Sequence, residues 1–106
     1  MPEVRTDATR PETTVGVPSA GTVVVRYWAA ARAAAGRSED AVPGARTVQQ
    51  ALDAVVAMRP GDDRFARVLE ISSLLVAERP VRREGLDRVP VTAGDVVEVL
   101  PPFAGG

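Results

Sequence analysis

The sequence predicts an α+β domain in which a mixed β-sheet packs on one main helix. Val-rich runs with the composition of β-strands lie at residues 22–28 and 96–100. The strongest helical periodicity lies between them and begins after Thr47. A ferredoxin-like arrangement would need a second long helix late in the chain, and the pattern predicts none there. The order strand, strand, helix, strand, short strand, strand is that of a β-grasp fold.

The composition excludes several classes of function. The chain has 106 residues, 45% of them hydrophobic, and a formal net charge of −1. It contains neither cysteine nor histidine, so disulfides, thiolate nucleophiles, the usual general base and the commonest metal ligands are all missing. We therefore predict neither a conventional hydrolase nor a metal site. The slightly acidic balance also argues against a general nucleic-acid binder.

The chain divides into three predicted segments. Residues 1–21 are rich in Thr and Pro and show no strand or helix period, which predicts a disordered leader. Residues 22–100 form the β-grasp domain, and residues 101–106 form a flexible tail that ends in Gly-Gly. No apolar run approaches the roughly 20 residues that span a bilayer, and no signal-peptide pattern is present. We expect a cytoplasmic protein.

The first predicted unit is a pair of strands joined through a short helix. Residues 22–28 combine β-branched and aromatic side chains and run directly into the alanine-rich helix 29–35, which Gly36 ends. Residues 38–42 return as a second strand, and a turn follows at Pro43-Gly44. We expect the two strands to pair as a hairpin-like unit.

The main helix is predicted from Thr47 onward. Thr47 is a good N-cap, and Gln50 three residues later completes a capping box. Pro60-Gly61 ends the helix. Its apolar side chains recur at helical spacing and form one stripe made of Val48, Ala51, Leu52, Val55, Val56 and Met58.

The remaining elements follow the main helix in quick succession. Asp62 caps a shorter helix. The apolar side of that helix is formed by Phe65, Val68 and Leu69. Residues 71–77 are predicted as a strand, followed by a turn at residues 78–80. The final strand covers residues 96–100, and Pro101 ends it because proline cannot donate a ladder hydrogen bond.

The last strand separates two kinds of residue. Period-2 alternation puts Val97 and Val99 on one face of the sheet and Leu100 on the other. If the face of Val97 and Val99 packs on the helix, Leu100 lies at the surface and is available to a partner. The alternative is that a second layer buries Leu100, and the sequence leaves both possibilities open.

The chain end is the most informative feature of the sequence. Glycine has no Cβ, so the terminal Gly105-Gly106 pair can pass through a channel too narrow for other residues. The preceding Pro101-Pro102 pair favours an extended form of about 3.1 Å per residue, which projects the tail away from the sheet. Phe103 is a large apolar side chain in this tail. We interpret it as an anchor in a partner groove, the alternative being that it folds back onto the chain's own surface.

Two stretches together carry a family resemblance. Residues 25–36 contain an aromatic strand end and an alanine that lead into a short helix with Arg32, closed by glycine. Residues 94–106 contain a Gly-Asp turn, the last strand, Pro-Pro and the terminal Gly-Gly. From about Thr22 to its end, the chain resembles the ubiquitin-like sulfur carriers, most closely the small subunits of molybdopterin synthase. Ala33 departs from the pattern, because the family often has an acidic residue there.

The resemblance implies that the C-terminal carboxylate of Gly106 is the reacting group. An enzyme resembling ubiquitin-activating enzymes would use ATP to convert this carboxylate to an acyl-adenylate. A persulfide would then give a thiocarboxylate, and in molybdopterin synthase the sulfur would pass to a cyclic pyranopterin. Gly106 is then a carrier of sulfur and not a catalyst, and the chain itself binds no cofactor.

The resemblance also implies roles for the rest of the tail and for the partners. Gly105 and Ala104 would thread into a partner's active site. The residues expected to contact partners are Phe103, Pro102, Pro101 and Leu100. The implied partners are the large subunit of molybdopterin synthase, which would hold the catalytic groups, and the adenylating and sulfurating enzyme. We expect no nucleic acid, membrane or metal partner.

Three other functions stay open at this point. The chain is alternatively a sulfur carrier for thiazole, cysteine or secondary-metabolite synthesis, although thiazole carriers tend to lack the Pro101-Pro102 pair. A second alternative is a ubiquitin-like modifier whose Gly106 forms an amide with a lysine of a target protein. The last alternative is a plain interaction module with an incidental tail, which would keep its function when Gly105-Gly106 is deleted.

Overall fold

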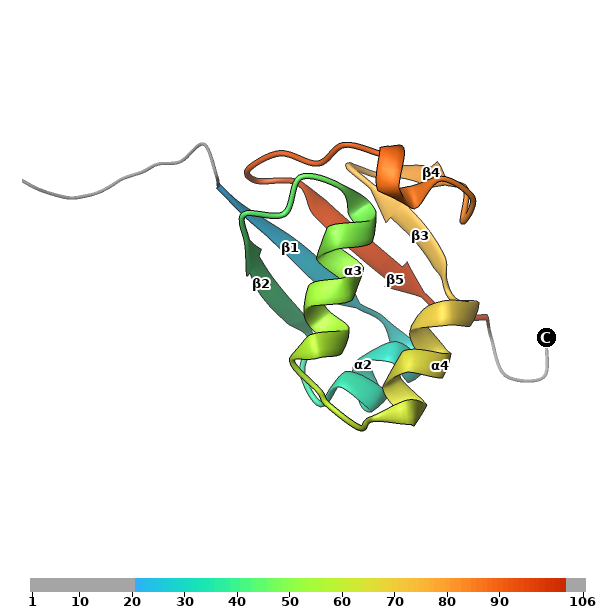
Figure 1. Cartoon of the computed structure of the whole chain (residues 1–106). Helices are drawn as coiled ribbons and strands as arrows, with labels where there is room; N and C mark the ends of the chain where they lie inside the picture. Colours follow the sequence, from blue (N-terminus) through green and yellow to red (C-terminus); the bar gives the residue numbers. More distant parts are fainter. Residues whose placement is uncertain (1–20, 103–106) are drawn as a thin grey trace, which may run out of the picture.

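The computed structural model describes residues 21–102, which form a mixed sheet with its helices packed on one face (Figure 1). The sheet has five strands in the order β2-β1-β5-β3-β4. The strands are β1 (Thr22–Tyr27), β2 (Glu39–Pro43), β3 (Ser73–Val76), β4 (Arg79–Val81) and β5 (Val96–Leu100). The helices are α2 (Ala29–Ala35), α3 (Val48–Ala57), α4 (Asp63–Ile71) and the short 3₁₀ helix η2 (Leu86–Arg88). The predicted ubiquitin-like β-grasp is confirmed.

The first and last strands form the centre of the sheet, as predicted. β1 pairs in parallel with β5, so that Val25 lies opposite Val97 and Tyr27 lies opposite Val99. β1 also pairs antiparallel with β2, and β5 pairs antiparallel with β3. The inward-facing side chains of both central strands are fully buried, as alternation requires of a sheet with one covered face. This central pair therefore fixes the place at which the chain leaves the domain.

Helix α3 begins where its cap predicts. The Thr47 hydroxyl accepts a hydrogen bond from the Gln50 N–H at 3.1 Å. The Gln50 side chain accepts from the Arg46 N–H at 2.8 Å, one residue before the position expected in a capping box. The buried stripe consists of Val48, Ala51, Leu52 and Val55. Val56 and Met58 are exposed, so the predicted stripe was too wide by these two residues; Met58 lies beyond the last helical residue.

The boundary between α4 and β3 differs from the prediction. The Asp62 carboxylate accepts from the Phe65 N–H at 2.9 Å, which confirms the predicted cap. Ile71, however, is the last residue of α4 and is 65% exposed, and the strand begins only at Ser73. The amphipathic period of α4 extends to Leu69, which is buried, and Ile71 lies off that face. An isolated β-branched residue was therefore wrongly assigned to the strand.

The turn after β3 also differs from the prediction. It consists of Ala77 and Glu78, whose φ angles are 50° and 68°. Val76 lies opposite Arg79, so Arg79 and Pro80 already belong to β4 and are not in the turn. Positive φ at both central residues is typical of a type I′ hairpin turn, which usually contains Gly or Asn. Ala77 and Glu78 stand where Gly or Asn is usual, so no local residue signal marks this turn.

None of the helices in the described range 21–102 is long and apolar enough to cross a membrane.

Candidate functional site at the root of the C-terminal tail

The structure describes three of the predicted site residues, and the others follow residue 102 and lie outside the described range. Leu100, Pro101 and Pro102 are described, and we call these three residues the tail root. Leu100 ends β5 and is half-buried, Pro101 is half-buried, and Pro102 is exposed. Phe103, Ala104, Gly105 and Gly106 lie outside the described residues, so their predicted roles as anchor, threading residues and reacting group stay predictions.

The tail root leaves a central strand between two flanking segments. On one side, the backbone N–H of Trp28, directly after β1, donates to the Val99 carbonyl at 3.1 Å. On the other side, Ser73 at the start of β3 lies opposite Leu100. Trp28 is 44% exposed, and Ile71, two residues before Ser73, is also exposed. Large apolar side chains in both flanking segments are therefore open to solvent.

Leu100 lies on the face of the sheet that the helices leave uncovered (Figure 1). Val96 and Glu98 share this face and are half-buried. Val97 and Val99, which alternate with them along the strand, are fully buried under the helices. No second layer covers this face within residues 21–102, which answers the question left open by the sequence. Leu100 is therefore accessible, and its contact with a partner stays a prediction.

A row of polar side chains crosses this open face. The Arg26 guanidinium on β1 lies 3.4 Å from the Glu39 carboxylate on β2. Arg26 also lies opposite Glu98 of β5 in the strand register. Glu98 in turn accepts a hydrogen bond from the Trp28 indole N–H at 3.0 Å. Exposed ion pairs contribute little to stability, so the main consequence of this row is to orient the groups beside the tail root.

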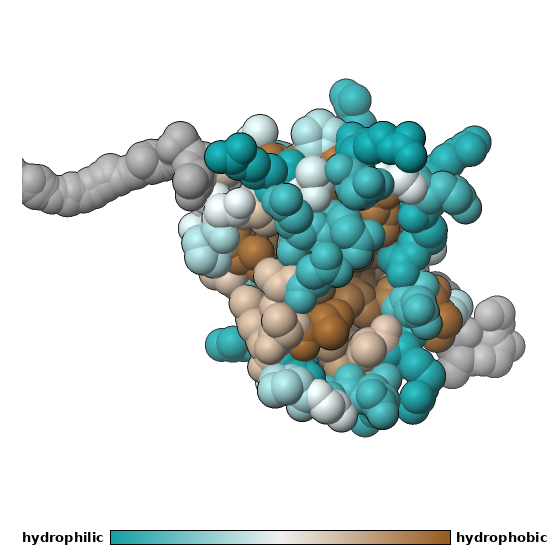
Figure 2. All heavy atoms as spheres, in the orientation of Figure 1, coloured by the Kyte–Doolittle hydropathy of each residue, from teal (hydrophilic) through white to brown (hydrophobic). Residues whose placement is uncertain are grey.

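The opposite, helical face carries an apolar patch among the helices (Figure 2). A groove of about 340 Å³ runs there between α3, α4 and η2. Its apolar lining includes Leu52, Val56, Ala66 and Leu69, and Arg83 and Glu70 lie at its polar edge. This groove lies on the helical face, whereas the Leu100 side chain lies on the open face of the sheet. Within residues 21–102, no group of three or more acidic side chains is arranged to hold a metal ion.

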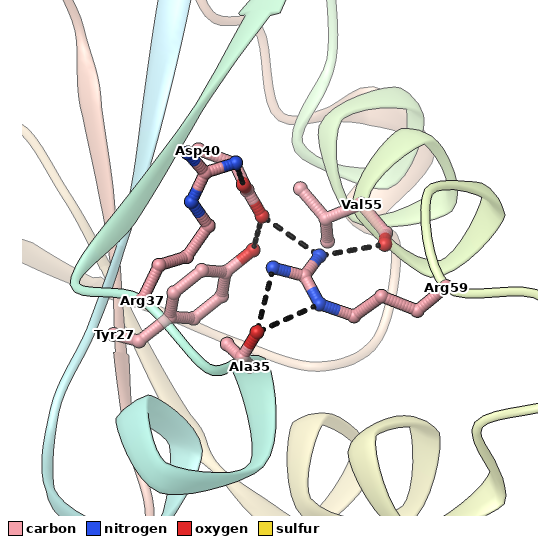
Figure 3. Close-up of polar contacts among 6 residues, drawn as sticks. All are labelled: Tyr27, Ala35, Arg37, Asp40, Val55 and Arg59. Carbon is pink, nitrogen blue, oxygen red and sulfur yellow. Dashed lines mark hydrogen bonds and ion pairs between the residues drawn. The ribbon is translucent and has the colours of Figure 1, made fainter.

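A buried polar cluster that the sequence analysis missed connects the sheet to the helices (Figure 3). The Asp40 carboxylate of β2, whose side chain is 1% exposed, lies 2.8 Å from the Arg59 guanidinium and 3.2 Å from that of Arg37. The Tyr27 hydroxyl donates to the same Asp40 oxygen that pairs with Arg59. Buried charges are tolerated when they are paired and hydrogen-bonded in this way.

Arg59 extends this cluster to three helices. Its guanidinium donates to the Ala35 carbonyl at the end of α2 at 3.2 and 3.3 Å, and to the Val55 carbonyl of α3 at 3.1 Å. It also lies over the Phe65 ring of α4, 4.4 Å from the ring centroid. Because Tyr27 immediately precedes Trp28, the cluster fixes the end of β1 beside the tail root.

The cluster shifts the pKa values of Tyr27, Asp40 and Arg59. Burial raises the pKa of Tyr27, and the hydrogen bond to Asp40 raises it further. Burial alone would raise the pKa of Asp40, but the hydrogen bonds from Arg59 and Tyr27 and the charges of Arg59 and Arg37 outweigh it, so this pKa is lowered. Burial opposes the charge of Arg59, yet its bond to Asp40 and its interaction with Tyr27 raise its pKa. Asp40 and Arg59 are therefore a stable ion pair rather than a proton-transfer site.

The alternation of buried and exposed residues along β2 indicates one member of this cluster. Asp40 is in phase with Val42, and both face the core. A carboxylate in phase with a core valine predicts a buried partner, because buried carboxylates are almost always paired. Nothing comparable marks Arg59, which follows α3 in an irregular segment just before Pro60.

Comparison with known proteins agrees with this architecture. Residues 25–106 match the ThiS family. This match covers most of the chain, so the chain belongs to the ThiS family of small, ubiquitin-like sulfur carriers, which are not themselves catalytic. No curated protein sequence matches the chain.

Several solved structures share the fold. SAMP1 from Haloferax volcanii is 26% identical with a TM-score of 0.65, and the match covers 81% of this chain and 100% of that chain. SAMP1 from Methanosarcina acetivorans is 22% identical with a TM-score of 0.61, covering 81% and 97%. A chain of the complex of subunits 1 and 2 of molybdopterin-converting factor from Helicobacter pylori is 20% identical with a TM-score of 0.58, covering 80% and 99%.

Proposed function

We propose that this chain is the sulfur-carrying small subunit of a molybdopterin synthase, which donates sulfur from its C-terminus to a cyclic pyranopterin. The observation that carries the proposal is the family match, which runs through to the terminal Gly105-Gly106. The tail root adds support, since a central strand leads the chain out between exposed apolar side chains of Trp28 and Ile71. A carrier needs this arrangement, because its end must enter a partner while its body is held.

The proposed chemistry begins with activation of the Gly106 carboxylate. A carboxylate is a poor electrophile because it has no good leaving group. Reaction with ATP gives an acyl-adenylate and releases pyrophosphate. A persulfide on the activating enzyme displaces AMP to form an acyl disulfide. A thiol then cleaves the S–S bond, which leaves the thiocarboxylate on Gly106 and a disulfide on the enzyme.

The catalytic groups belong to the partners in this scheme. The chain has no histidine or cysteine to supply acid–base or thiol chemistry. Its contribution is to present the tail. In the proposal, Pro101 and Pro102 extend the chain from the sheet, Phe103 anchors in a partner groove, and Ala104 and Gly105 pass through the channel to the active site. The nucleotide site is on the activating enzyme.

The acceptor is proposed from the tail sequence. The Pro101-Pro102 pair before Phe103 resembles molybdopterin synthase small subunits rather than thiazole carriers. We therefore propose a large synthase subunit as the second partner, in line with the Helicobacter pylori complex of two subunits, one chain of which has this fold. In such a complex the thiocarboxylate sulfur attacks a side-chain carbon of the pterin and displaces an oxygen substituent, which gives a thioester. Hydrolysis of the bond between the Gly106 carbonyl carbon and the sulfur leaves the sulfur on the pterin as a thiol and returns Gly106 to a carboxylate.

A second candidate is a protein modifier. SAMP1 from Haloferax volcanii is a small archaeal modifier protein of the same fold and is 26% identical to the chain. Activation would be the same up to the acyl-adenylate. The carbonyl of Gly106 would then form an amide with the ε-amine of a lysine on a target protein. The two functions differ in product, since one leaves a thiocarboxylate and the other a covalent conjugate.

Genetic replacement in the native host distinguishes the acceptors. A host strain that lacks this chain should lose the activity of enzymes that need the molybdenum cofactor, and the full chain should restore it. A chain without Gly106 keeps all of the described domain but lacks the reacting group, so it should not restore the activity of these enzymes. A thiamine requirement with normal molybdenum enzymes would instead assign the chain to thiazole synthesis.

A further inference from the structure

We propose that copies of this chain associate with one another, with Ile71 of one copy seated in the groove between α3, α4 and η2 of the next copy. The proposal concerns the surface formed by residues 21–102 and does not depend on the pathway that the carrier serves. It rests on two different sides of α4. One side presents an exposed isoleucine beside two arginines, and the other borders an apolar groove with two carboxylates at its edge.

The first side of α4 joins an apolar side chain to two cations. Arg64, Arg67 and Ile71 are spaced i, i+3 and i+7, so they lie in one row along the helix. All three are exposed, and Ile71, at 65%, is the most exposed large hydrophobic residue within residues 21–102. Neither arginine takes part in an ion pair within this range. We call these three residues the α4 ridge.

The groove borders a different side of the same helix. Ala66 and Glu70, which are spaced i and i+4, line it from α4, whereas Arg64 and Arg67 do not. Because each residue turns a helix by about 100°, the α4 ridge and the row of Ala66 and Glu70 point in directions about 110° apart. One copy can therefore present its ridge to a neighbour while its own groove stays open to another copy.

The groove can accept an apolar side chain. Its volume is about 340 Å³, and Leu52, Leu69 and Leu86 form its buried lining. Val56 also lines it and is 37% exposed. An isoleucine that enters the groove would cover Val56 and remove apolar surface of both copies from water, which favours association.

The edge of the groove complements the charge of the α4 ridge. Asp53 of α3 and Glu70 of α4 are exposed carboxylates in its lining. Asp53 uses one oxygen to accept from the Gln49 side chain at 2.9 Å, which leaves the second oxygen able to accept another donor. Glu70 takes part in no ion pair within residues 21–102. Two carboxylates are thus available to the two guanidinium groups of a neighbouring ridge.

The cation in the groove lining is already held by the helix end. The Arg83 guanidinium donates to the Leu69 carbonyl at 3.1 Å and to the Glu70 carbonyl at 2.6 Å. These carbonyls lie at the C-terminus of α4, where the helix dipole is negative and offsets part of the charge of Arg83. The edge of the groove therefore stays acidic in balance and favours a basic neighbour.

The contact would cover one flank of the tail root. Ile71 lies two residues before Ser73, which is opposite Leu100 in the sheet. A copy whose Ile71 is seated in a neighbour's groove cannot offer this side chain to a partner enzyme. Self-association and partner binding therefore compete, and associated copies form a reserve that dissociates when a partner binds the tail root.

Sedimentation equilibrium of the full-length chain tests the association. A contact centred on one isoleucine is small, so we expect a dissociation constant on the order of 0.1–1 mM. The ridge and the groove are different surfaces, so the contact is heterologous and association continues beyond the dimer. The weight-average mass should be near that of the monomer at about 0.005 mM and at least half as large again at about 1 mM.

Two single variants locate the apolar part of the contact. Ile71→Asp should keep the chain monomeric at about 1 mM, and because Ile71 is exposed the variant should still fold. Trp28→Ala is the matched control, because Trp28 is also a large exposed apolar residue at the tail root but lies outside α4 and the groove. It should associate as the natural chain does.

Charge reversal identifies both surfaces together. A chain with Arg64→Glu and Arg67→Glu has an acidic ridge and an acidic groove edge, and a chain with Asp53→Arg and Glu70→Arg has a basic ridge and a basic groove edge. Each should stay monomeric alone. An equimolar mixture should associate again, because every ridge can then meet a groove of opposite charge.

Amide spectra establish that each variant is folded. Three results would overturn the proposal: a natural chain that stays monomeric up to about 1 mM, an Ile71→Asp chain that still associates, or a mixture of the two folded charge-reversed chains that stays monomeric.

Discussion

The Trp28 indole N–H donates a hydrogen bond to the Glu98 carboxylate at 3.0 Å, and this bond joins residues that are 70 positions apart in the sequence. Trp28 follows the first strand and Glu98 lies in the last, two residues before its end, so the bond links these two strands on the open face of the sheet near the tail root. It holds a large aromatic side chain at the surface in a fixed orientation. Pre-oriented aromatic side chains are typical anchors in protein interfaces, which makes Trp28 the strongest described candidate for a partner contact.

Replacing Trp28 should lower the affinity of the activating enzyme for the chain. We expect Trp28→Ala to raise the KM for the chain in ATP–pyrophosphate exchange about tenfold, the effect of an interface anchor worth more than 1 kcal/mol. Met58→Ala is the control, because Met58 is also a large exposed apolar residue but follows α3 on the helical face. Equal KM values for the two variants would contradict an interface at the tail root.

Breaking the buried ion pair should strongly destabilise the domain. Arg59→Met leaves the Asp40 carboxylate buried without its main partner and should lower the free energy of unfolding by about 3–5 kcal/mol. Arg64→Met, which removes an exposed arginine of α4, should cost under about 0.5 kcal/mol. Urea unfolding measures both changes. A loss below about 1 kcal/mol for Arg59→Met would show that the cluster is not a structural element.

The same pair predicts how stability depends on pH. The pKa of Asp40 is lower in the folded chain than in the unfolded chain. Its contribution is therefore present above the unfolded value of about 3.9 and is lost as the pH falls through the folded value. Asp40→Asn should be less stable than the natural chain at pH 7, and the difference should shrink as the pH is lowered below about 4. A constant difference across this range in urea unfolding would contradict the assignment.

The cap of α4 provides a test of the helix assignment. Asp62→Ala removes the acceptor of the Phe65 N–H and should lower the free energy of unfolding by about 1 kcal/mol. Asp63→Ala is the matched control, since it removes a neighbouring exposed carboxylate that accepts no capping hydrogen bond among residues 21–102. Its loss in about 0.15 M salt should cost only about 0.3 kcal/mol, because salt screens the interaction with the helix dipole. If thermal unfolding shows an equal or larger loss for Asp63→Ala, Asp62 is not the cap.

The glycine before the terminal residue should be needed for reaction rather than for folding. Gly105→Ala adds a Cβ where the tail is proposed to pass through a channel, and it should lower the rate of adenylation at least tenfold. Ala104→Gly removes a Cβ one residue earlier and should leave the rate nearly unchanged. Thermal unfolding of both variants should match the natural chain. A normal rate for Gly105→Ala would contradict the threading role.

The sequence predicts most of this fold because its strongest signals are local. The Val-rich central strands, the Thr47 and Asp62 caps and the hairpin-like unit all come from residues close together in the chain, and the structure contains each of them. The errors arose where local patterns compete. Ile71 has strand propensity but ends a helix, and the turn at residues 77–78 has positive φ without glycine.

The site is predictable only in part for a related reason. The tail sequence predicts a chemistry at Gly106 that stays a prediction, and the family match shows that the chain belongs to a family of sulfur carriers. Its surroundings depend on contacts between distant residues: Trp28 with Glu98, and Asp40 with Arg59. Such contacts depend on strand order and register, which a single sequence does not specify. Asp40 was detectable from alternation alone, whereas its partner was not.

The central claim is that Gly106 carries sulfur. The most direct measurement is the intact mass of the chain taken from its native host under sulfur-replete conditions, with fragmentation to locate any change. The account predicts a fraction of molecules in which one oxygen is replaced by sulfur at Gly106. A carboxylate that stays unmodified under all conditions, or Gly106 joined to a lysine of another protein with no thiocarboxylate, would contradict it.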